Sequence, residues 1–465
     1  MTARLHLAFG LGLALLVAAL VGIDPFLSQY LPGRLWRAAG VEASPLKLVP
    51  LLAGLALLAL PLLPQLARLP EFALAATAAL LLAAQLNGFG VGPFDVFDLV
   101  LGVVFLAWIA RKALDETRPI ALPPLLVLAG GLVLVSVLHL AVENPVRWFI
   151  GTFGIARAAL VAFLAIDLIR DRPTMERALD AFLWLAVASA LAGIVQFGLS
   201  WSGVLDFTLI NPPESAFKPT PVGFVMRASA FCITAQHFSS FLVYALPIAF
   251  WRLSNGRAAR HWAAVLLLLG GILVSWNFGA MIAAMLIGAV FPFLRWPRLA
   301  VHFAMALAAA AVLAWFTGFW DLLYDLSFGD AGVAKGVSQR HTLFGLGIEK
   351  IARNPLAGTG PQGFAGYDGN FWGRPVHNAF GQVTTELGLA GLLLLAGAYA
   401  WLIGKLAVAL AAPGPMRGLT AVVFLMLLAA LQLAQSEPNM DHTNTWIVLG
   451  LAQAMLLVRA RALDQ

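Results

Sequence analysis

One stretch of this 465-residue chain concentrates side chains that bind anions and exchange protons. Guanidinium groups keep their charge and bind the oxygens of an anion through pairs of N–H groups. An imidazole, with an ordinary pKa of about 6.5, accepts and releases a proton close to neutral pH. Their types and proximity predict a site that holds an anionic ligand and moves a proton. The cationic residues between positions 340 and 377 are Arg340, His341, Lys350, Arg353, Arg374 and His377.

The first half of this stretch has the pattern of an amphipathic helix. Between residues 337 and 353, apolar side chains recur at the spacing of one helical face. A helix with one apolar and one cationic face is suited to lie along a membrane surface. We therefore expect a surface helix here. Its apolar positions are Leu343, Phe344, Ile348 and Ile351.

A tight loop should follow that helix. Asn354 precedes Pro355, and the residue before a proline is disfavoured in helical backbone, so the helix should end there. Gly358, Gly360 and Gly363 come next. Glycine permits backbone conformations closed to other residues and lets the backbone approach a ligand closely. The spacing predicts a compact turn between the surface helix and His377.

Two motifs in this region resemble those of a family of bacterial membrane proteins, the O-antigen ligase and O-antigen polymerase superfamily. Its signature H-N-x9-G-x-x-G is similar to His377-Asn378 followed, after nine residues, by Gly388-Leu-Ala-Gly391. Its N-P-L-x-G-x-G-x-x-x-F run is similar to the sequence from Asn354 to Phe364. Arg340, upstream of that run, resembles the family's loop arginine.

Arg227 extends the resemblance to an earlier segment. The run 227–231, Arg-Ala-Ser-Ala-Phe, resembles the outer arginine that precedes a span in this family, usually followed by Gly-Thr-Phe and a His-Pro-Asn. The chain departs from the pattern twice. Residues 234–237, Thr-Ala-Gln-His, replace His-Pro-Asn, and residues 275–277, Ser-Trp-Asn, stand where the family often has Ser-Arg-Gly.

The resemblance implies a glycosyltransferase that acts outside the cytoplasm. Such enzymes move a glycan from a polyprenyl (undecaprenyl) pyrophosphate carrier to a hydroxyl of a glycan or of lipid A-core, in lipopolysaccharide or exopolysaccharide biosynthesis. It implies that Arg227 and Arg340 bind the pyrophosphate, with Arg353 or Arg374 as further support. His377 would be the general base. The residues implied as structural parts of the motifs are Asn354, Pro355, Gly358, Gly360, Asn378, Gly388 and Gly391.

The composition requires a membrane scaffold to position these residues. Hydrophobic residues make up 61% of the chain and charged residues 11%, whereas soluble domains carry about 25% charged residues. Apolar runs long enough to span a bilayer, about 20 residues each, recur from end to end. They lie at about 5–23, 48–67, 72–89, 96–110, 119–141, 148–169, 178–199, 229–251, 263–276, 278–294, 299–319, 388–406, 418–435 and 445–458.

These runs predict an all-α, polytopic membrane helical bundle, and the resemblance implies a GT-C-like fold. The stretch 263–294 is short for two full crossings, because a helix rises about 1.5 Å per residue and the hydrocarbon core is about 30 Å thick. We expect two short helices or a re-entrant hairpin there, turning near residues 275–279. The total is then about 14 spans, or about 12 with a hairpin.

Basic residues next to the spans fall on one side of the predicted membrane, which the positive-inside rule makes the cytoplasm. Both termini are then cytoplasmic, and the loop 320–387 and the turn 436–444 face the periplasm. We expect one integral domain, 1–465, in the bacterial inner membrane, with the active site in the periplasmic loop. The basic residues are Arg4, Arg68, Arg111, Lys112, Arg118, Arg170, Arg172, Arg177, Arg252, Arg257, Arg260, Arg295, Arg298, Lys405, Arg417, Arg459 and Arg461.

Other classes of function leave less trace in the sequence. No D-x-D at a span exit and no H-E-x-x-H pair is present, so we predict no metal and no cofactor. No basic and aromatic stripe indicates nucleic acid. A transporter remains an alternative, although its ionisable groups would lie near the midplane. Within the transferases, ligase, polymerase and protein O-oligosaccharyltransferase all remain open.

Four further residues have more than one interpretation. Cys232, the single cysteine, is expected to be a small buried side chain. Arg157 lies within a predicted span, where a charge is costly, so it should pair with a neighbouring helix or contact the carrier lipid. Asp441 and His442 are expected in a solvated turn.

Overall fold

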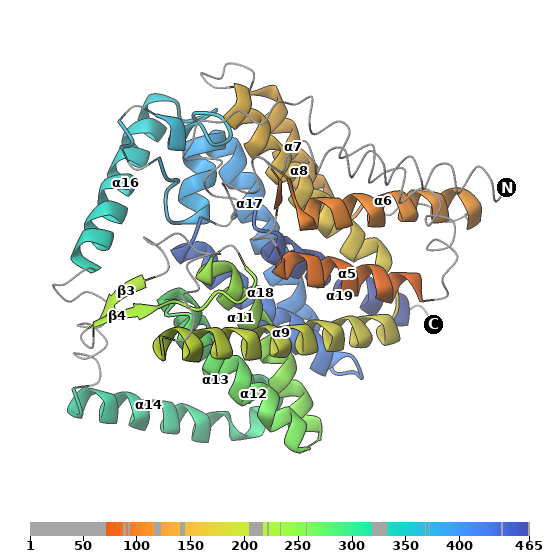
Figure 1. Ribbon diagram of the computed structural model, residues 1–465. Coiled ribbons are helices and arrows are strands. Elements are labelled where there is room, and N and C mark those ends of the chain that lie inside the picture. Colours follow the sequence, from red (N-terminus) through yellow and green to blue (C-terminus); the bar gives the residue numbers. More distant parts are fainter. Residues whose placement is uncertain are drawn as a thin grey trace. The chain divides into compact units, whose positions relative to one another are not determined.

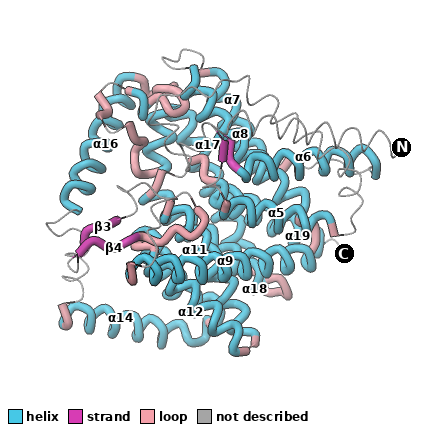
Figure 2. The backbone as a smooth tube through the Cα atoms, in the orientation of Figure 1, coloured by secondary structure: helices cyan, strands magenta, loops and turns pink. Residues whose placement is uncertain are grey.

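The computed structural model describes most of the chain beyond residue 70 (Figures 1 and 2). The predicted spans 5–23 and 48–67 lie outside the described residues. So does the part of the long loop between residues 318 and 333. The described ranges are 71–86, 90–91, 94–115, 122–139, 145–203, 217–220, 223–232, 234–256, 258–318, 333–367, 369–371, 373–438 and 440–463.

The chain divides into two compact units. The first contains α5 (Phe72–Gln85) and α6 (Val96–Asp115), with the antiparallel pair β1 (Gly90–Val91) and β2 (Phe94–Asp95) between them. The guanidinium of Arg111 lies 5.5 Å from the ring centre of Phe72 and joins the two helices. Cys232 belongs to this unit and is buried, as expected, with Sγ 3.4 Å from Gln85 Oε1.

The second unit contains the remaining described helices and one strand pair. Its first helices are α7 (Pro124–Leu138), α8 (Pro145–Leu168), α9 (Arg172–Trp201), α11 (Ala235–Asn255), α12 (Ala259–Val274), α13 (Phe278–Arg295) and α14 (Ala300–Phe316). Its later helices are α16 (Val333–Arg353), α17 (Ala379–Ala411), α18 (Arg417–Ser436) and α19 (Thr443–Leu463). The short elements are β3 (Phe217–Thr220), β4 (Gly223–Met226) and the 3-10 turns η2 (Pro297–Leu299) and η3 (Phe364–Gly366).

The described residues are mostly helical, so the all-α prediction is confirmed at that level. Within the described residues, six helices are long and apolar enough to cross a membrane, namely α8, α9, α13, α17, α18 and α19. The shorter apolar helices α5, α7 and α12 coincide with predicted spans as well. Each predicted run from residue 72 onward corresponds to one helix. The chain is a multi-pass, helical membrane protein by length and composition.

Helix starts follow the expected capping chemistry. Asp171 caps α9 by accepting a hydrogen bond from Thr174 N at 2.8 Å. Thr234 caps α11 through His237 N, and Asn378 caps α17 through Gly381 N at 2.9 Å. A side-chain oxygen at this position satisfies a backbone N–H that the helix itself leaves without a partner.

The core of the second unit depends on close helix contacts at small residues. A Cβ at Gly450 of α19 would lie 2.8 Å from Ala165 Cβ of α8. Gly193 of α9 similarly approaches the ring of Phe238 on α11. Small residues let helix backbones approach, which matters in a membrane because lipid is as apolar as the side chains and gives helices no hydrophobic drive to associate.

The stretch 263–294 forms two helices, as one of the two expected arrangements requires. α12 ends at Val274, and α13 begins at Phe278. Ser275 and Trp276 make the turn between them, with Trp276 at a φ of 48°. The turn predicted near residues 275–279 is confirmed, and its position proves important for the site.

Polar contacts divide the second unit into two ends. At one end, Arg461 Nη1 donates to Arg170 O at 2.9 Å, and Arg295 Nε donates to Ser254 Oγ at 3.1 Å. We name this the basic end; it comprises residues 170–180, 252–256, 258, 295–298, 412–417 and 459–461. The opposite termini of these helices and the loops next to them form the site end, which comprises residues 227–230, 234, 275–278, 354–367, 369–371, 373–378, 435–438 and 440–442. Several described basic residues of this unit that the sequence places on one side, among them Arg170, Arg295 and Arg461, therefore lie at one end of it.

Candidate functional site

Helix α17 is broken at the first glycine of the G-x-x-G motif. Gly388 has a φ of 67° and a ψ of −164° inside an otherwise continuous helix. Only glycine adopts this conformation readily, because a Cβ would clash with the backbone. A Cβ at Gly388 would also lie 2.2 Å from Leu356 O. The motif glycine therefore marks the place where another segment meets the helix.

That segment is the loop of the N-P-L-A-G-T-G run. Thr359 N donates to Thr385 O at 2.9 Å, and Gly360 N donates to Glu386 O at 2.8 Å. In return, Leu389 N donates to Pro355 O at 2.8 Å. A break in a helix leaves backbone groups without partners, and here the loop supplies them. The two sequence motifs are thus two halves of one interlocked structure.

Side chains reinforce the interlock. Asn354 Nδ2 donates to Gly358 O at 2.9 Å and closes the loop on itself. Gly358 has a φ of 71° and lies against the backbone of Glu386. The buried Glu386 carboxylate accepts a hydrogen bond from Gln362 N at 2.8 Å. Helix α16 ends at Arg353, just before Asn354-Pro355, as predicted, and the loop that follows has a fixed geometry.

His377 lies at the junction between this loop and α17. Its neighbour Asn378 caps the helix and also donates from Nδ2 to Gln435 O at 3.2 Å. Val376, on the other side, is buried in a small apolar cluster with Leu343 and Phe364. The histidine is therefore held from α18 on one side and from α16 on the other.

Helix α16 has the predicted amphipathic character. Leu343 is fully buried, while Phe344 and Ile348 are 51% and 53% exposed. Gly347 packs on α17, where a Cβ would lie 3.0 Å from Thr385 Cγ2. One face of the helix thus fixes it to the unit, and a second face is apolar and exposed. The expected contact of that face with a membrane surface stays a prediction.

Arg227 is placed by the turn between α12 and α13. It follows β4, which pairs with β3 in an antiparallel hairpin. Ala228 N donates to Val274 O at 2.9 Å, and Arg227 Nε donates to Ser275 O at 3.1 Å. The sequence 275–277 departs from the family pattern, yet it holds this arginine in place through its backbone.

Glu437 is a site residue that the sequence did not reveal. It ends α18, is 4% exposed, and accepts a 2.6 Å hydrogen bond at Oε1 from Asn277 Nδ2. Burial raises the pKa of Glu437 to about 7, while the Asn277 hydrogen bond and the charges of Arg227 and Arg340 act to lower it. A carboxyl whose pKa is about 7 is partly charged and partly neutral at neutral pH.

Electrostatic interactions join the predicted residues to one another. Burial lowers the pKa of Arg227 to about 10, with Glu437 acting to raise it and Arg340 to lower it further. Burial also lowers the pKa of His377 to about 4, and the charges of Arg340 and Arg374 act in the same direction. Arg227 therefore stays charged at neutral pH, and His377 is a neutral imidazole able to accept a proton. We name Arg227, Arg340, Arg374, His377 and Glu437 the cationic cluster.

Arg353 is not part of this cluster. It forms an ion pair with Glu349, one helical turn earlier. The side chain of Arg353 is 65% exposed and that of Glu349 is 50% exposed. Arg374 is exposed as well, although its charge acts on His377. Of the four arginines predicted to bind pyrophosphate, the structure groups three around His377 and Glu437.

The turn after Glu437 is packed rather than solvated, so that expectation was wrong. The ring of His442 lies 4.0 Å from that of His237, centre to centre. His237 belongs to the segment that replaces His-Pro-Asn, and its Nδ1 lies 2.8 Å from Thr234 Oγ1. Burial lowers the pKa of His442 to about 4, as does the charge of Arg157. Arg157 therefore faces this histidine pair from α8.

Metal ligands are not grouped in the described residues. No three side chains among His, Cys, Asp and Glu come together in a way that could hold a metal ion in the part of the chain that the structure describes. The cationic cluster itself would repel a cation. The cluster is suited to bind an anion beside His377, whose neutral imidazole can accept a proton.

Comparison with known proteins adds no identification. No protein-family model matches the chain, and no curated protein matches its sequence. The resemblance to the O-antigen ligase and polymerase superfamily therefore depends on the motifs themselves, which the structure joins at Gly388.

Proposed function

We propose that this protein is an integral-membrane glycosyltransferase that moves a glycan from a polyprenyl pyrophosphate to a hydroxyl acceptor. The observation that carries the proposal is the grouping of Arg227 with Arg340 and His377, which belong to a loop much later in the sequence. An anion site beside a neutral imidazole has the two functions that this reaction needs. In the class we favour, the acceptor belongs to a growing polysaccharide or to lipid A-core.

The arginines would bind the diphosphate of the donor. Arg227 donates only its Nε to the described residues, so its two Nη groups remain available to a ligand. Arg340 makes no hydrogen bond to any residue that the structure describes. Guanidinium groups at this place would stabilise the negative charge that develops on the diphosphate as it leaves.

His377 would act as the general base. Its imidazole nitrogen takes the proton of the acceptor hydroxyl while the hydroxyl oxygen attacks the anomeric carbon. The bond between that carbon and the diphosphate oxygen breaks, and the electron pair leaves with the polyprenyl diphosphate. One displacement of this kind inverts the anomeric centre. Binding of the diphosphate also offsets the charges of Arg340 and Arg374, which raises the pKa of His377 and makes it a stronger base.

The location of the reaction follows from the two ends of the second unit. The basic end carries the residues that the positive-inside rule assigns to the cytoplasm. The cationic cluster lies at the site end, which we assign to the periplasmic face of the bacterial inner membrane. A donor that carries its own leaving group suits this face, because nucleotide sugars and ATP are not available there.

The decisive experiment compares two histidine variants. Purified protein in lipid nanodiscs is given a polyprenyl-diphosphate glycan and candidate acceptors, and transfer is measured. His377→Ala should lower the rate roughly 10²- to 10⁴-fold, the usual contribution of a general base. His341→Ala is the matched control, because His341 is an exposed histidine on α16 next to Arg340 in sequence and is not one of the residues assigned to the reaction.

The outcomes separate the alternatives. Equal rates for wild type and His377→Ala would refute the assignment of the base. Passage of the intact lipid-linked glycan across the bilayer, without a new glycosidic bond, would indicate a transporter. Transfer to a protein acceptor only would indicate a protein O-oligosaccharyltransferase. The same assay tests our prediction that no metal is needed, since a chelator should leave the rate unchanged.

A further inference from the structure

Glu437 presents a buried negative charge at a site that is otherwise cationic. A carboxylate that competes with a diphosphate for the same arginines should weaken donor binding, so its presence requires an explanation. Its neighbours are fixed. Asn277 Nδ2 donates to Glu437 Oε1 at 2.6 Å and to Ser239 Oγ at 2.8 Å, and Glu437 N donates to Leu433 O at 3.0 Å.

The second carboxyl oxygen is left open. Glu437 Oε2 is buried and makes no hydrogen bond to any described residue. The arginines act on it through space, and no ion pair joins Glu437 to Arg227 or Arg340 in the described part of the chain. The carboxyl is thus close enough to feel both charges, yet it leaves their N–H groups available.

The groups that act on Glu437 come from several neighbouring elements. Arg227 follows β4, Arg340 belongs to α16, and Asn277 precedes α13. From α11, Ser239 contacts Asn277, and Tyr244 lies within electrostatic reach of Glu437. Two cations favour the charged carboxylate and burial favours the neutral acid. The balance lies near neutral pH, where burial raises the pKa to about 7.

We propose that Glu437 is the exchangeable counter-charge of the diphosphate site, ionised while the site is empty and protonated when the diphosphate is bound. This inference rests on the proposed function. The bound diphosphate adds negative charge beside Glu437 and neutralises the arginines that kept it ionised. A proton from solvent then moves to the carboxyl oxygen, and it returns to solvent when the diphosphate leaves. Glu437 is in this sense a positioning residue that couples donor binding to proton uptake.

The sign of the pH dependence follows from linkage. A group whose pKa rises on binding makes binding tighter as pH falls, with a slope of up to tenfold per pH unit. Below the pKa of the empty site, the proton is already present and the effect ends. For a pKa of about 7 in the empty site, the dissociation constant of the donor should rise roughly 10- to 30-fold between pH 6.5 and pH 8.5. A change of this size corresponds to the uptake of about one proton on binding.

The test is calorimetric titration of the protein in detergent with a polyprenyl diphosphate that carries one sugar. Both phosphates of this probe are esterified, so the ligand itself takes up no proton between pH 6.5 and pH 8.5. Titration in buffers with different ionisation enthalpies gives the number of protons bound. We expect wild type to take up between half a proton and one proton at pH 7.5. Glu437→Gln should take up less than half of the wild-type amount, the remainder coming from His377, whose pKa also rises on binding, and its pH dependence should be correspondingly weaker.

A control carboxyl distinguishes this effect from a general loss of charge. Glu386→Gln removes another buried carboxyl of the same unit, whose partners are Gln362 and Gln382 rather than the arginines. This variant should retain the proton uptake and the pH dependence of wild type. Glutamine keeps an acceptor oxygen at either position, which limits damage to the fold.

Each outcome has a distinct meaning. Donor binding without proton uptake in wild type, or with the same uptake in Glu437→Gln, would overturn the role of Glu437 and leave the glycosyltransferase proposal intact. Absence of donor binding in wild type at any pH would overturn the proposed function itself. If Glu437→Gln did not fold, Asn277→Ala offers a second test, because it removes the hydrogen bond that holds the carboxyl. The pH profile of proton uptake by this variant should be shifted relative to wild type. An unshifted profile would count against the proposal.

Discussion

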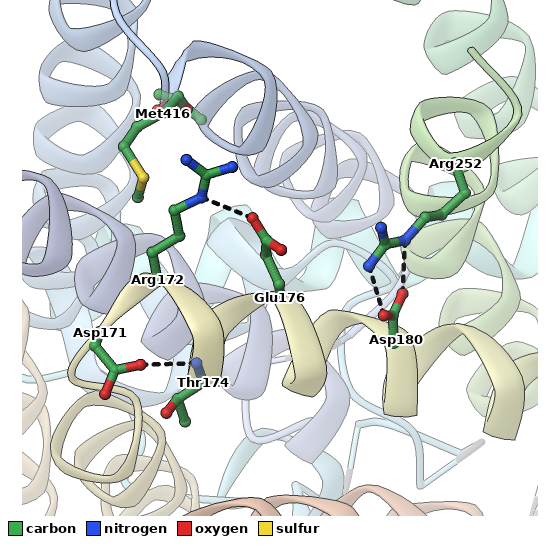
Figure 3. A network of polar contacts seen from close by, with 8 residues as sticks. Asp171, Arg172, Thr174, Glu176, Asp180, Arg252 and Met416 are labelled. Atoms are coloured by element: carbon green, nitrogen blue, oxygen red, sulfur yellow. Dashed lines mark hydrogen bonds and ion pairs between the residues drawn. The ribbon is translucent and has the colours of Figure 1, made fainter. Parts of the chain in front are cut away.

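Arginines at the two ends of the second unit differ in their partners. At the basic end, Arg252 donates from Nε and Nη2 to the two oxygens of Asp180, and Arg172 pairs with Glu176 (Figure 3). At the site end, Arg227 donates to a backbone carbonyl, and its nearest carboxyl, Glu437, makes no ion pair with it among the described residues. An arginine that already binds a carboxylate in a fork geometry has few N–H groups left to donate to a phosphate. The difference therefore separates arginines that connect helices from those suited to a ligand.

The two ends are also built from different interactions. Side-chain ion pairs connect α9 to α11 at the basic end. At the site end, backbone hydrogen bonds connect the loop 355–360 to the break in α17. Backbone contacts fix position more tightly than long flexible side chains, which lose rotamer freedom when they pair. Such rigidity suits residues that must hold a reacting group.

The largest expected effect comes from the helix break. Gly388→Ala should destabilise the protein by about 2–6 kcal/mol, because it combines strain in a glycine-only conformation with a severe clash against Leu356 O. Thermal unfolding in detergent measures this. Gly397→Ala in the same helix is the control, since nothing lies within 4 Å of its Cβ position, and it should be neutral or stabilising. Equal stability of the two variants would show that the interlock is unimportant.

The next effect concerns the type of cation. Arg340→Lys should lower kcat/KM for the donor roughly 10- to 100-fold, because lysine offers a point charge where arginine offers a planar fork. Arg353→Lys, on the same helix but paired with Glu349, should be close to wild type. Full activity of Arg340→Lys at low donor concentration would remove the basis for a fork-like contact with diphosphate.

The ion pair at the basic end should contribute a smaller amount. A double-mutant cycle on Arg252 and Asp180, with alanine at each position, should give a coupling of about 0.5–1 kcal/mol, because both side chains are partly exposed to solvent. Donor turnover at saturation should not change. A coupling of several kcal/mol, or a loss of turnover, would mean that the two ends do not differ as we describe.

The smallest effect is expected at the exposed pair on α16. Arg353→Ala should change stability by less than about 0.5 kcal/mol, the usual value for an exposed ion pair one helical turn apart. Transfer activity should remain within twofold of wild type, roughly the error of such assays. A larger loss of activity would return Arg353 to the pyrophosphate site that the family resemblance implied.

The sequence predicted the helices well because a membrane imposes one simple rule on them. A helix that crosses lipid must be apolar for most of its length, so hydropathy alone places the described helices from α7 to α14, and α18 and α19, to within several residues. The end of α16 at Arg353 was equally predictable, since Pro355 follows two residues later and disfavours helical backbone at Asn354.

The site could be predicted only in part. His377 and the arginines stood out because charged residues are rare in this chain and gather in one loop. Glu437 and Asn277 did not, because they meet across 160 positions of sequence and neither forms a motif. The predicted span 388–406 began where hydropathy rises, whereas α17 begins at Ala379 and changes direction at Gly388. Hydropathy cannot detect a break whose partners come from another loop.

The most direct test of the account is the affinity of the donor for four arginine variants. We predict that Arg227→Ala and Arg340→Ala each weaken binding of a polyprenyl-diphosphate sugar by at least about tenfold, the value of one charged hydrogen bond. Arg252→Ala and Arg353→Ala should bind within about twofold of wild type, as expected for arginines already held by carboxylates. Equal affinity in all four variants would contradict the claim that the cationic cluster is a diphosphate site.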